Sequence, residues 1–544
     1  MTPFKKVWKI FFVMQRGEKF LVSLLVAILF VSLGQLFFSE FHFISKQEKG
    51  VFSEGMVGKI HTLNPLFVDF NDTDRDMSEL IFSGLIRYDP IKKNFYPDLA
   101  ESWTRGKDDK TYTFNLRTNV LWHDAKPFTA DDVVFTFKNV VQDPGFRNPI
   151  LKNAFEEVGV AKSGSHEVTF TLPRSNSYFI SNLTAGILPK HLLENSAIAT
   201  MEQSPFSQQP VGTGSYKVTK LSIDSDGDYI DLVAFEQYYG DKPVIPHIRF
   251  FTYPNENSLM GDASVLSAVS KLGSKSEAAA EIAAGGKFSI YNYTLNQFTA
   301  IYYNTDHPVL KDKKTRQALT KILDKNAFIL DGEQRVDSVG LYDRSDEDIF
   351  KSASAEGEKM LDELGWKKGE DGMRANEKGE KLSFLLLTIS KMPKKLVESI
   401  QKQWKAAGID LSVQAQESES FSSQLSERRY AILLIRQNLG YNRDIYPLFH
   451  SSQATTTGLN FSNFKSFRTD GLTEAIRKET DSKSKEKLLV ELSKAISDET
   501  PVVFISTPVY SYALPKGLAE FQAKDLDFHS DRLSIVPFLT SINP

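Results

Sequence analysis

The stretch "ESWTRGKDDKTYTFNLRTNVLWHDAKPFTADDVVFTF", residues 101–137, decides the fold and raises a question about chemistry. Polar and apolar residues alternate from Tyr112 to Arg117, which is the pattern of a strand with one buried face. The stretch also holds a His-Asp pair at 123–124 and an Asp-Asp pair at 131–132. Side chains of these types carry out acid–base and metal chemistry, so their place in the fold has to be established first.

The Asp-Asp pair is positioned to begin a helix. Thr129 stands three residues before Asp132, and apolar residues follow at helical spacing as far as Val140. A Thr-x-x-acid sequence before such a stripe is a capping pattern, and acids in the first turn interact favourably with the helix dipole. We therefore expect Asp131 and Asp132 to start a helix and not to form a catalytic dyad. The His-Asp pair is predicted to lie in the preceding turn.

The rest of the chain has no motif typical of an enzyme or a metal site. It contains no Gly-x-Ser-x-Gly, no phosphate-binding loop ending in Lys-Ser/Thr and no His-Glu-x-x-His. The acid-rich stretch 222–235 lacks the spacing of a calcium loop, and its Asp-Gly pair predicts a hairpin. "VGTGSYK" (211–217) is interpreted as a turn entering a strand. We expect no enzyme activity, no cofactor and no metal; a catalytic site assembled from distant residues is the alternative.

Composition narrows the class of protein. The chain has 544 residues, enough for two or three domains, with 41% hydrophobic and 25% charged residues, as in an ordinary globular protein. A net charge of −4 provides no basic field for a nucleic acid. The absence of cysteine excludes disulfides, thiolate metal sites and a lipidated N-terminal cysteine.

The N-terminal segment predicts a membrane anchor. Residues 20–38 carry no charge, and at about 1.5 Å per residue a helix of this length crosses a bilayer core. Positive residues dominate the leader 1–19, so we expect it to stay in the cytoplasm while the remainder is exported. A signal peptide cleaved after small residues such as Ser32 and Gly34 is the alternative. Residues 39–55 are interpreted as a tether.

Helices and strands alternate in the C-terminal half. Apolar residues recur at helical spacing over 400–407 and again over 488–496. Each stripe is followed by a strand pattern, an alternating run at 409–413 and a continuous apolar run at 501–506. This alternation predicts an α/β fold.

Several spaced blocks resemble one family. The longest is "YPDLAESWTRGKDDKTYTFNLRTNVLWHDAKPFTADDVVFTF" (96–137), in which Ala125 replaces a glycine of the family pattern. The other blocks are "LNPLF" (63–67), "IFSGLIRYDP" (81–90), "PVGTGSYKV" (210–218), "EQYYGDKP" (236–243), "YYNTDHPVLKDKKTRQALTKILDK" (302–325), "ELGWKKGEDGMR" (363–374) and "LNFSNFKSFRTDGLTEAI" (459–476). In this order they resemble the family 5 extracellular solute-binding proteins, the oligopeptide, dipeptide and nickel binding components of ABC importers.

The resemblance implies an α/β, two-lobed periplasmic-binding-protein-like fold of type II, in the large peptide-binding subclass, behind an N-terminal transmembrane helix. Lobe I would consist of 56–289 and 509–544, and lobe II of 290–508. Hinge strands are expected near "AIYYNT" (300–305) and "VVFISTPVY" (502–510). A solute held between the lobes would favour the closed form.

The resemblance also implies where the solute binds. Peptide-binding members carry, after a lobe II strand, a tryptophan, an aspartate for the peptide α-amino group and an acid-proline pair; here the stretch is "LLIRQNLGYNRDIYPLF" (433–449). Tyr441 falls near the amine-binding aspartate, and Ile445 replaces the proline. A tyrosine hydroxyl accepts a hydrogen bond from an ammonium but supplies no charge. The candidate ligand-binding residues are Asn64, Tyr303, Arg436 (for an anionic group, or else a solvated rim residue), Asn438 near the tryptophan, Tyr441, and Asp444 at the acid of the acid-proline pair.

These observations predict a single-pass protein of the cytoplasmic membrane with its C-terminal body on the periplasmic side. We expect a monomer that captures a peptide or related small solute and delivers it to an ABC permease, with no nucleic-acid partner. Because the amine anchor is altered, the alternative is an extracytoplasmic sensory or interaction module of the same fold that no longer binds a transport ligand.

Overall fold

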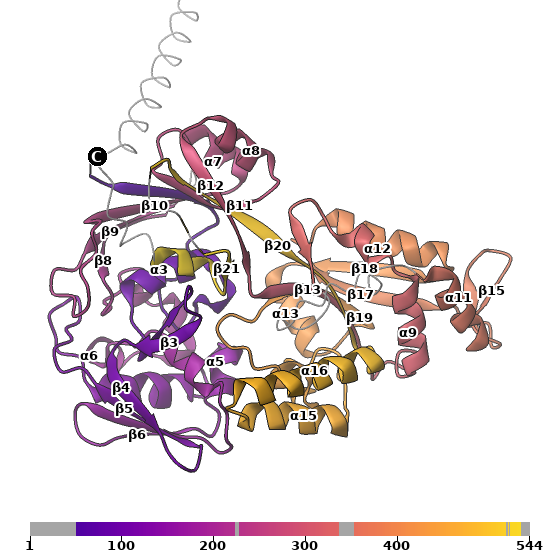
Figure 1. Ribbon diagram of the computed structural model, residues 1–544, viewed down its shortest axis with the longest axis horizontal. Coiled ribbons are helices and arrows are strands. Elements are labelled where there is room, and N and C mark those ends of the chain that lie inside the picture. Colours follow the sequence, from indigo (N-terminus) through magenta and orange to yellow (C-terminus); the bar gives the residue numbers. More distant parts are fainter. Residues whose placement is uncertain (1–49, 224–227, 337–352, 518–520, 522, 535–544) are drawn as a thin grey trace, which may run out of the picture.

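The computed structural model describes residues 50–223, 228–336, 353–517, 521 and 523–534, which form two lobes joined by long strands (Figure 1). Within these residues, thirteen strands pair into one sheet that runs through both lobes. In sheet order they are β18 (Asp410–Gln416), β17 (Ser383–Ile389), β19 (Ile432–Asn438), β13 (Gln297–Tyr303), β20 (Val502–Pro515), β11 (Ala268–Gly273), β1 (Phe52–Val57), β10 (His247–Tyr253), β9 (Tyr229–Ala234) and β8 (Tyr216–Ser222), with β12 (Phe288–Leu295), β14 (Glu333–Arg335) and β21 (Asp525–Leu526) paired beside this row.

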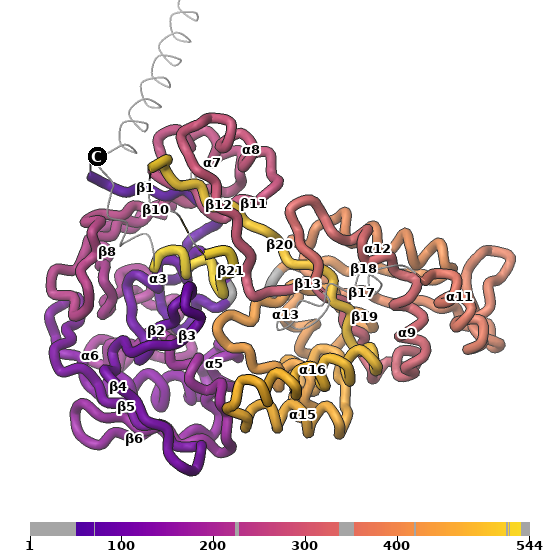
Figure 2. The backbone as a smooth tube through the Cα atoms, viewed as in Figure 1, coloured from indigo at the N-terminus to yellow at the C-terminus, as the bar shows by residue number. Residues whose placement is uncertain are grey.

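Strand β20 joins the two lobes. Its first half pairs with β13, and its second half, from Val509, pairs with β12 (Figure 2). Strands β12 and β13 are separated only by Asn296, so the two chain crossings lie on neighbouring strands. Lobe I therefore contains the described residues up to Leu295 and from Val509 onward, and lobe II those from 297 to 506. The expected boundary between 289 and 290 cuts through β12 and moves to the end of that strand.

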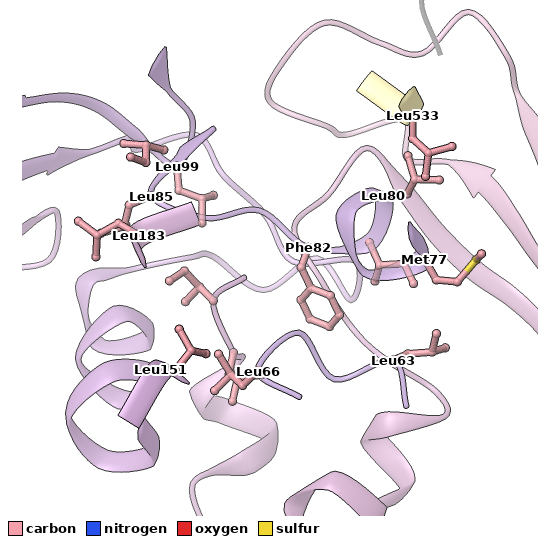
Figure 3. Close-up of a cluster of buried hydrophobic side chains, with 14 of the residues drawn as sticks. Leu63, Leu66, Met77, Leu80, Phe82, Leu85, Leu99, Leu151, Leu183 and Leu533 are labelled. Carbon is pink, nitrogen blue, oxygen red and sulfur yellow. The ribbon is translucent and has the colours of Figure 1, made fainter. Parts of the chain in front are cut away.

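Both faces of the lobe I sheet are covered by helices. Phe250 of β10 packs in the core that contains α3 (Asp72–Ile81), whereas Phe251 packs in the core that contains α7 (Glu256–Asp262) and α8 (Glu277–Ala284). Successive side chains of a strand point to opposite faces, so a strand buried on both sides has a continuous apolar sequence. Figure 3 shows part of the α3 core, including Met77 and Leu80.

Strand β1 corrects the expected tether. Residues 52–55, assigned to the tether from the sequence, belong to β1, which is buried and pairs in parallel with β10 and β11. A buried central strand belongs to the folded body, so a tether would have to end before Phe52. The predicted leader and anchor, and residues 39–49 of the tether, lie outside the described residues. Within the part of the chain that is described, no helix is both long and apolar enough to cross a membrane.

Residues 101–137 form the strand and the helix expected of them. The strand is β5 (Thr111–Leu116), which pairs in a four-stranded sheet with β4 (Ala100–Arg105), β7 (Glu167–Thr171) and β6 (Gly159–Lys162). The helix is α4 (Ala130–Val134), which continues as the π-helical segment η2 (Phe135–Val141). The carboxylate of Asp132 accepts hydrogen bonds from the N–H groups of Thr129 (2.9 Å) and Lys190 (3.0 Å). The capping interpretation of the Asp-Asp pair is confirmed.

The His-Asp pair lies in the turn before this helix, as predicted. His123 accepts a hydrogen bond at Nδ1 from the N–H of Gly212 (3.2 Å), and its Nε2 lies 3.0 Å from the carbonyl oxygen of Gly214. These partners match the neutral ring protonated at Nε2, and burial lowers the pKa of His123 to about 4. Ala125 adopts a φ of +65°, which accounts for the glycine in the family pattern.

Helices also cover both faces of the lobe II sheet. Ile301 and Tyr303 of β13 pack in the core with α9 (Lys313–Ile322), α11 (Ser354–Glu363) and α12 (Lys394–Ala406). Ala300 and Tyr302 pack in the core with α13 (Ser418–Ser426), α14 (Tyr446–Phe449), α15 (Phe467–Lys478) and α16 (Ser482–Glu499). The helical stripes at 400–407 and 488–496 correspond to α12 and α16, and the strands predicted after them correspond to β18 and β20.

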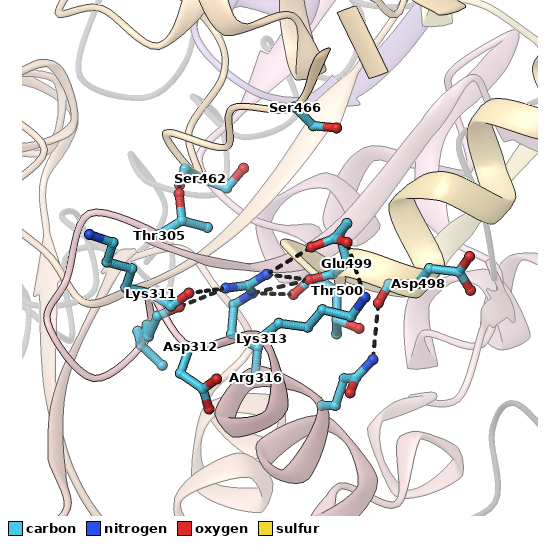
Figure 4. A network of polar contacts seen from close by, with 12 residues as sticks. Thr305, Lys311, Asp312, Lys313, Arg316, Ser462, Ser466, Asp498, Glu499 and Thr500 are labelled. Atoms are coloured by element: carbon cyan, nitrogen blue, oxygen red, sulfur yellow. Dashed lines mark hydrogen bonds and ion pairs between the residues drawn. The ribbon is translucent and has the colours of Figure 1, made fainter. Parts of the chain in front are cut away.

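Arg316 of α9 fixes the end of α16, where the chain turns into β20 (Figure 4). Its Nε lies 3.2 Å from the carbonyl oxygens of Glu499 and Thr500, and Thr500 has a φ of +50°. The last carbonyl groups of a helix have no hydrogen-bond donor within the helix. The buried guanidinium donates to them and so stabilises the turn. The start of the strand that joins the lobes is therefore held firmly in lobe II.

The remaining elements are short. They are β2 (Ile86–Asp89), β3 (Asn94–Pro97), β15 (Lys367–Lys368), β16 (Arg374–Ala375), α5 (Pro149–Ala154), α6 (Lys190–Leu193), and the 3-10 segments η1 (Val68–Phe70), η3 (Phe179–Thr184), η4 (Ile198–Gln203), η5 (Pro205–Ser207), η6 (Lys325–Phe328), η7 (Ser451–Gln453) and η8 (His529–Ser534). The two strands of the hairpin predicted over 222–235, β8 and β9, pair in antiparallel orientation, and its Asp-Gly turn lies outside the described residues. The turn predicted at 211–217 also leads into β8, and a Cβ at Gly212 would lie 1.8 Å from the carbonyl oxygen of Ile81.

Candidate functional site

A small cavity lies where lobe I meets a loop of lobe II. About 60 Å³ of it is open to water molecules, enough for a few waters but not for a peptide. Eighteen lining residues belong to lobe I, and Tyr441 comes from lobe II. The lobe I residues are Glu79, Leu80, Phe82, Ser83, Gly84, Ile86, Arg87, Tyr88, Asp98, Thr184, Ser215, Tyr238, Asp241, Pro243, Ser530, Asp531, Leu533 and Ser534.

A buried charge network holds the two elements that form the cavity wall, α3 and η8. Arg532 of η8 is fully buried and binds Glu54 of β1 (Nε to Oε1, 2.9 Å) and Asp76 of α3 (Nη2 to Oδ2, 2.8 Å). Leu80 of α3 and Leu533 of η8 lie next to each other above Met77 (Figure 3). Polar and apolar contacts together therefore fix the C-terminal segment against α3.

Tyr441 crosses from lobe II and lines this cavity. Its hydroxyl donates a hydrogen bond of 2.5 Å to Asp531 of η8. Its ring lies 4.6 Å from the ring of Tyr88 and 4.8 Å from that of Phe528, measured between centroids. The preceding Gly440 has a φ of +55°, and a Cβ at this position would lie 2.1 Å from Cζ of Phe528. The loop after β19 therefore packs closely on lobe I.

Burial changes the protonation of two acids in the cavity. It raises the pKa of Asp531 to about 7, although the hydroxyl of Tyr441 and the N–H groups of Asp527 and Phe528 donate to that carboxylate. It also raises the pKa of Glu79, against the attraction of the nearby guanidinium groups. The lining cation, Arg87, already pairs with Asp98 (3.4 Å). The cavity therefore has little contact with water, and this burial favours the protonated, neutral form of both carboxyl groups.

The lobes also touch at the outer rim. The N–H of Ser177 in lobe I donates to the carbonyl oxygen of Arg477 in α15 (2.9 Å), and Lys485 of α16 donates to the hydroxyl of Ser177 (2.9 Å). Lys485 also lies 4.4 Å from the ring of Tyr178. With Tyr441 on the inner side and these contacts at the rim, the structure has the lobes closed against each other.

Among the sequence-predicted site residues, Tyr441 lines the cavity and the other five do not. Tyr303 is fully buried in the lobe II core, where its hydroxyl lies 3.1 Å from that of Thr320. Asn64 is fully buried in a turn, and its side-chain oxygen accepts from the N–H of Leu66 (3.2 Å). The sequence placed these two in the site because they lie in family blocks, but their side chains are used in the folded core.

The three remaining residues lie on β19 or in the loop after it. Arg436 pairs with Glu333 (2.9 Å), and the side-chain oxygen of Asn438 accepts from the N–H of Gly440 (2.8 Å). Asp444 is buried, and its carboxylate accepts from Nε of Arg477 (2.8 Å). Arg436 and Asp444 thus have partners of opposite charge inside lobe II.

Sequence reasoning missed the acidic residues Glu79, Asp98 and Asp531. A signal existed, because the family blocks at 81–90, 96–137, 210–218 and 236–243 contain most of the lobe I lining residues. Glu79 and Asp531 stand in no motif, and only tertiary packing of α3 against η8 brings them to one cavity.

Two other kinds of site have less support in the structure. Within the described residues, no group of three or more histidines and carboxylates could hold a metal ion. A wider, open depression on lobe II is lined by residues that include His307, Arg428 and Tyr430, away from the meeting of the lobes. It lacks the enclosure of a solute site, so the cavity at Tyr441 is the better candidate.

Comparison with known proteins identifies relatives over most of the chain. The family model "Bacterial extracellular solute-binding proteins, family 5 Middle" matches residues 94–458. The oligopeptide-binding protein AppA of Bacillus subtilis is 27% identical over 501 residues, covering 88% of this chain and 89% of AppA. The dipeptide-binding protein of Escherichia coli is 25% identical over 504 residues, covering 82% of this chain and 88% of that protein.

Solved structures agree with these sequence matches. AppA of Bacillus subtilis in complex with a nonapeptide superimposes with a TM-score of 0.75 at 26% identity, covering 90% of this chain and 99% of that one. NikZ of Campylobacter jejuni in complex with Ni(L-His) superimposes with a TM-score of 0.73 at 26% identity, with the same coverage. The two-lobed α/β periplasmic-binding-protein fold expected from the sequence is confirmed.

Proposed function

Because the chain belongs to the bacterial extracellular solute-binding proteins of family 5, we propose that it captures a peptide or related small solute between its lobes for an ABC permease. Its relatives include proteins named as oligopeptide-binding and dipeptide-binding, and its own ligand would be held without chemical change. The observation that carries this proposal is the construction of the body, with two lobes linked by neighbouring strands and one cavity lined from both sides.

The hinge explains how the solute would be trapped. Rotation about Asn296 and the middle of β20 separates the lobes, since each half of β20 stays paired in its own lobe. Opening withdraws Tyr441 from Asp531 and breaks the rim contacts at Ser177. A solute shifts this equilibrium only if it binds the closed form better than the open form. The closed form would then be the one delivered to the permease.

The protein is proposed to act from the membrane. Residues 20–38 are uncharged and long enough to span a bilayer core, and the basic leader before them favours a cytoplasmic N-terminus. Tethering would keep the monomeric body close to its permease on the periplasmic side. Carbonate extraction of membranes tests this: the full chain should stay in the pellet, whereas a variant that lacks 1–39 should be released. Release of the full chain would contradict the anchor.

One observation favours a second candidate function. Tyr441 of lobe II donates a hydrogen bond to Asp531 of lobe I, and the cavity that it lines is too small for a peptide. Because Tyr441 stands near the place of the peptide amine anchor, supplies no charge there and pairs with Asp531, the same fold would also suit an extracytoplasmic sensory or interaction module that has lost its transport ligand.

A thermal-shift screen with di- to pentapeptides, amines and sugars separates the two functions. A solute that binds only the folded protein at 100 times its Kd adds about 2.7 kcal/mol to stability, so a solute-binding protein should show clear upward shifts. Flat curves across all three classes would support the sensory module. Mass spectrometry of the species that co-purifies with the protein identifies the natural ligand.

A further inference from the structure

The sheet that runs through both lobes ends on one side in strand β18 of lobe II (Figure 1). All of β18 pairs in parallel with β17, from Ser383 opposite Asp410 to Ile389 opposite Gln416, without a register shift. Within the described residues, no strand pairs with the other side of β18. This strand is therefore a regular, unpaired edge of the sheet.

The backbone groups along this edge are mostly free. The N–H of Asp410 donates to the carbonyl oxygen of the residue before β17 (3.0 Å), so the even-numbered residues of β18 direct their backbone groups towards β17. Because the direction alternates along a strand, Leu411, Val413 and Ala415 direct theirs away from β17. Within the described residues, the only partner of these outward groups is Gln401, whose side chain donates to the carbonyl oxygen of Leu411 (3.0 Å). The other outward N–H and carbonyl groups can pair with another strand.

The two ends of the sheet differ in their protection against such pairing. Proteins usually protect an edge strand with charged side chains, proline or a bulge. Strand β8, at the other end of the sheet, carries Lys217 and Lys220 and has a register shift after Val218. Strand β18 has the sequence DLSVQAQ, with one charge at its first residue, no proline and no bulge. Asp410 and Ser412 also line the open depression of lobe II, so the described chain leaves space beside β18.

The sequence of β18 is complementary to itself about its middle residue. If two copies paired in antiparallel orientation about Val413, Leu411 would face Ala415 of the other copy, and Ser412 would face Gln414. Apolar residues would then meet on one face of the joined sheet and polar residues on the other. The residues with outward backbone groups would face one another in this register, which allows about six hydrogen bonds between the copies.

We propose that β18 is an interface between two copies of this chain, which join their sheets in antiparallel orientation about a two-fold axis at Val413. This inference goes beyond the proposed function and does not depend on a solute. Strands β17 and β19 separate β18 from the hinge strands β13 and β20, so pairing would leave the lobes free to move. One pair of strands is a small interface. We therefore expect copies held in one membrane to pair, and the free body in dilute solution to stay a monomer.

Disulfide mapping on the full chain in membranes tests the interface, because the chain has no cysteine of its own. In the proposed pair the two copies of Val413 stand opposite each other, with Cα atoms about 5.5 Å apart, which suits a disulfide. The two copies of Ala415 would be four residues out of register, about 13 Å apart along the strands. Ala415 is more exposed than Val413, so random collisions would link Ala415→Cys more readily than Val413→Cys.

Under a mild oxidant, Val413→Cys should give a covalent dimer in at least fivefold higher yield than Ala415→Cys. Lys220→Cys on β8 is the control at the other edge of the sheet and should stay monomeric. Ala415→Pro removes an outward N–H that has no partner within the described chain, and proline is tolerated on the free side of an edge strand. Adding Ala415→Pro to Val413→Cys should therefore lower the yield of dimer severalfold.

The inference is overturned if Val413→Cys gives no dimer in membranes, if Ala415→Cys links as well as Val413→Cys, or if Ala415→Pro leaves the yield unchanged. Hydrogen-exchange protection of residues 411–415 in membranes without a covalent dimer would mean that another chain covers the strand, and it would also exclude the second copy. The solute screen is a separate measurement, so flat curves there would count against the proposed function and not against this interface.

Discussion

Replacing Arg532 by methionine should lower the free energy of unfolding of lobe I by about 3 kcal/mol. The guanidinium is fully buried and binds Glu54 and Asp76, both of which are also fully buried. Removing one partner of a buried ion pair costs about 3–5 kcal/mol, because the other charge is left without compensation. Asp76 keeps Lys271 at 2.6 Å, whereas Glu54 keeps, among the residues that the structure describes, only the Tyr512 hydroxyl at 2.9 Å. Because only the carboxylate of Glu54 loses its cation, the cost should lie at the lower end of this range.

The control is Arg374→Met in lobe II, where the buried guanidinium has partners that reach water. The side chains of Glu358 and Asp362 are 30% and 45% exposed, so both stay solvated when Arg374 is removed. We expect a loss of about 1–2 kcal/mol, from hydrogen bonds to the carbonyl oxygens of Trp366 and Ala407. Adding Glu54→Gln to Arg532→Met should restore part of the stability.

Urea unfolding measures these differences, and hydrogen-exchange mass spectrometry assigns each transition to a lobe, since two lobes need not unfold as one unit. A loss below about 1 kcal/mol for Arg532→Met, or one no larger than for Arg374→Met, would refute the reasoning from burial.

Three further predictions follow from single contacts. Asp132→Ala should lower the free energy of unfolding by about 2–3 kcal/mol, because two backbone N–H groups lose their acceptor. Asp131 is more exposed, so Asp131→Ala should change it by less than about 1 kcal/mol. Equal losses of the two variants in urea unfolding would contradict the capping role. Stability should fall as the pH drops from 6.5 towards 4, by up to about 1.4 kcal/mol per pH unit from His123 alone, because its pKa is about 4 when folded and 6.5 when unfolded, so the unfolded chain binds the extra proton. Urea unfolding across this pH range should show a shallower slope for His123→Asn, and an unchanged slope would exclude the histidine as the cause. Gly440→Ala should open the lobes and enlarge the radius of gyration in small-angle scattering, because the added Cβ would meet Phe528. Gly365 is the control: its φ is also positive, at +85°, but a Cβ there would have no atom within 4 Å, so Gly365→Ala should leave the radius unchanged. Equal scattering of the two variants would argue against the contact.

Local sequence patterns were sufficient to predict the elements whose structure depends on neighbouring residues. The alternation at 112–116 and the capping pattern at Thr129 depend on residues a few positions apart, and both are present. The hairpin between β8 and β9 and the helix–strand pairs of lobe II are local in the same sense. Family blocks supplied the two-lobed arrangement, which residue patterns alone would not have given.

The candidate site could not be read from local pattern, because its residues come from distant segments. Glu79, Tyr441 and Asp531 are brought together only when α3, η8 and the loop after β19 pack against one another. Tyr303 shows the converse: its position in a family block suggested ligand contact, but the alternation of β13 turns it into the lobe II core. Residues 52–55 of β1 were assigned to a tether because a short segment reveals its sheet partners only in the folded protein.

The sequence by itself determined the α/β class and the helix starts, because periodicity and caps are properties of a few neighbouring residues. It also determined the membership of the family, through the spacing of its blocks. Only the tertiary structure decided which charged side chains are buried and which of them pair with one another. Burial and pairing depend on chain segments that are hundreds of residues apart, such as Glu54 and Arg532, and no local pattern records their distance.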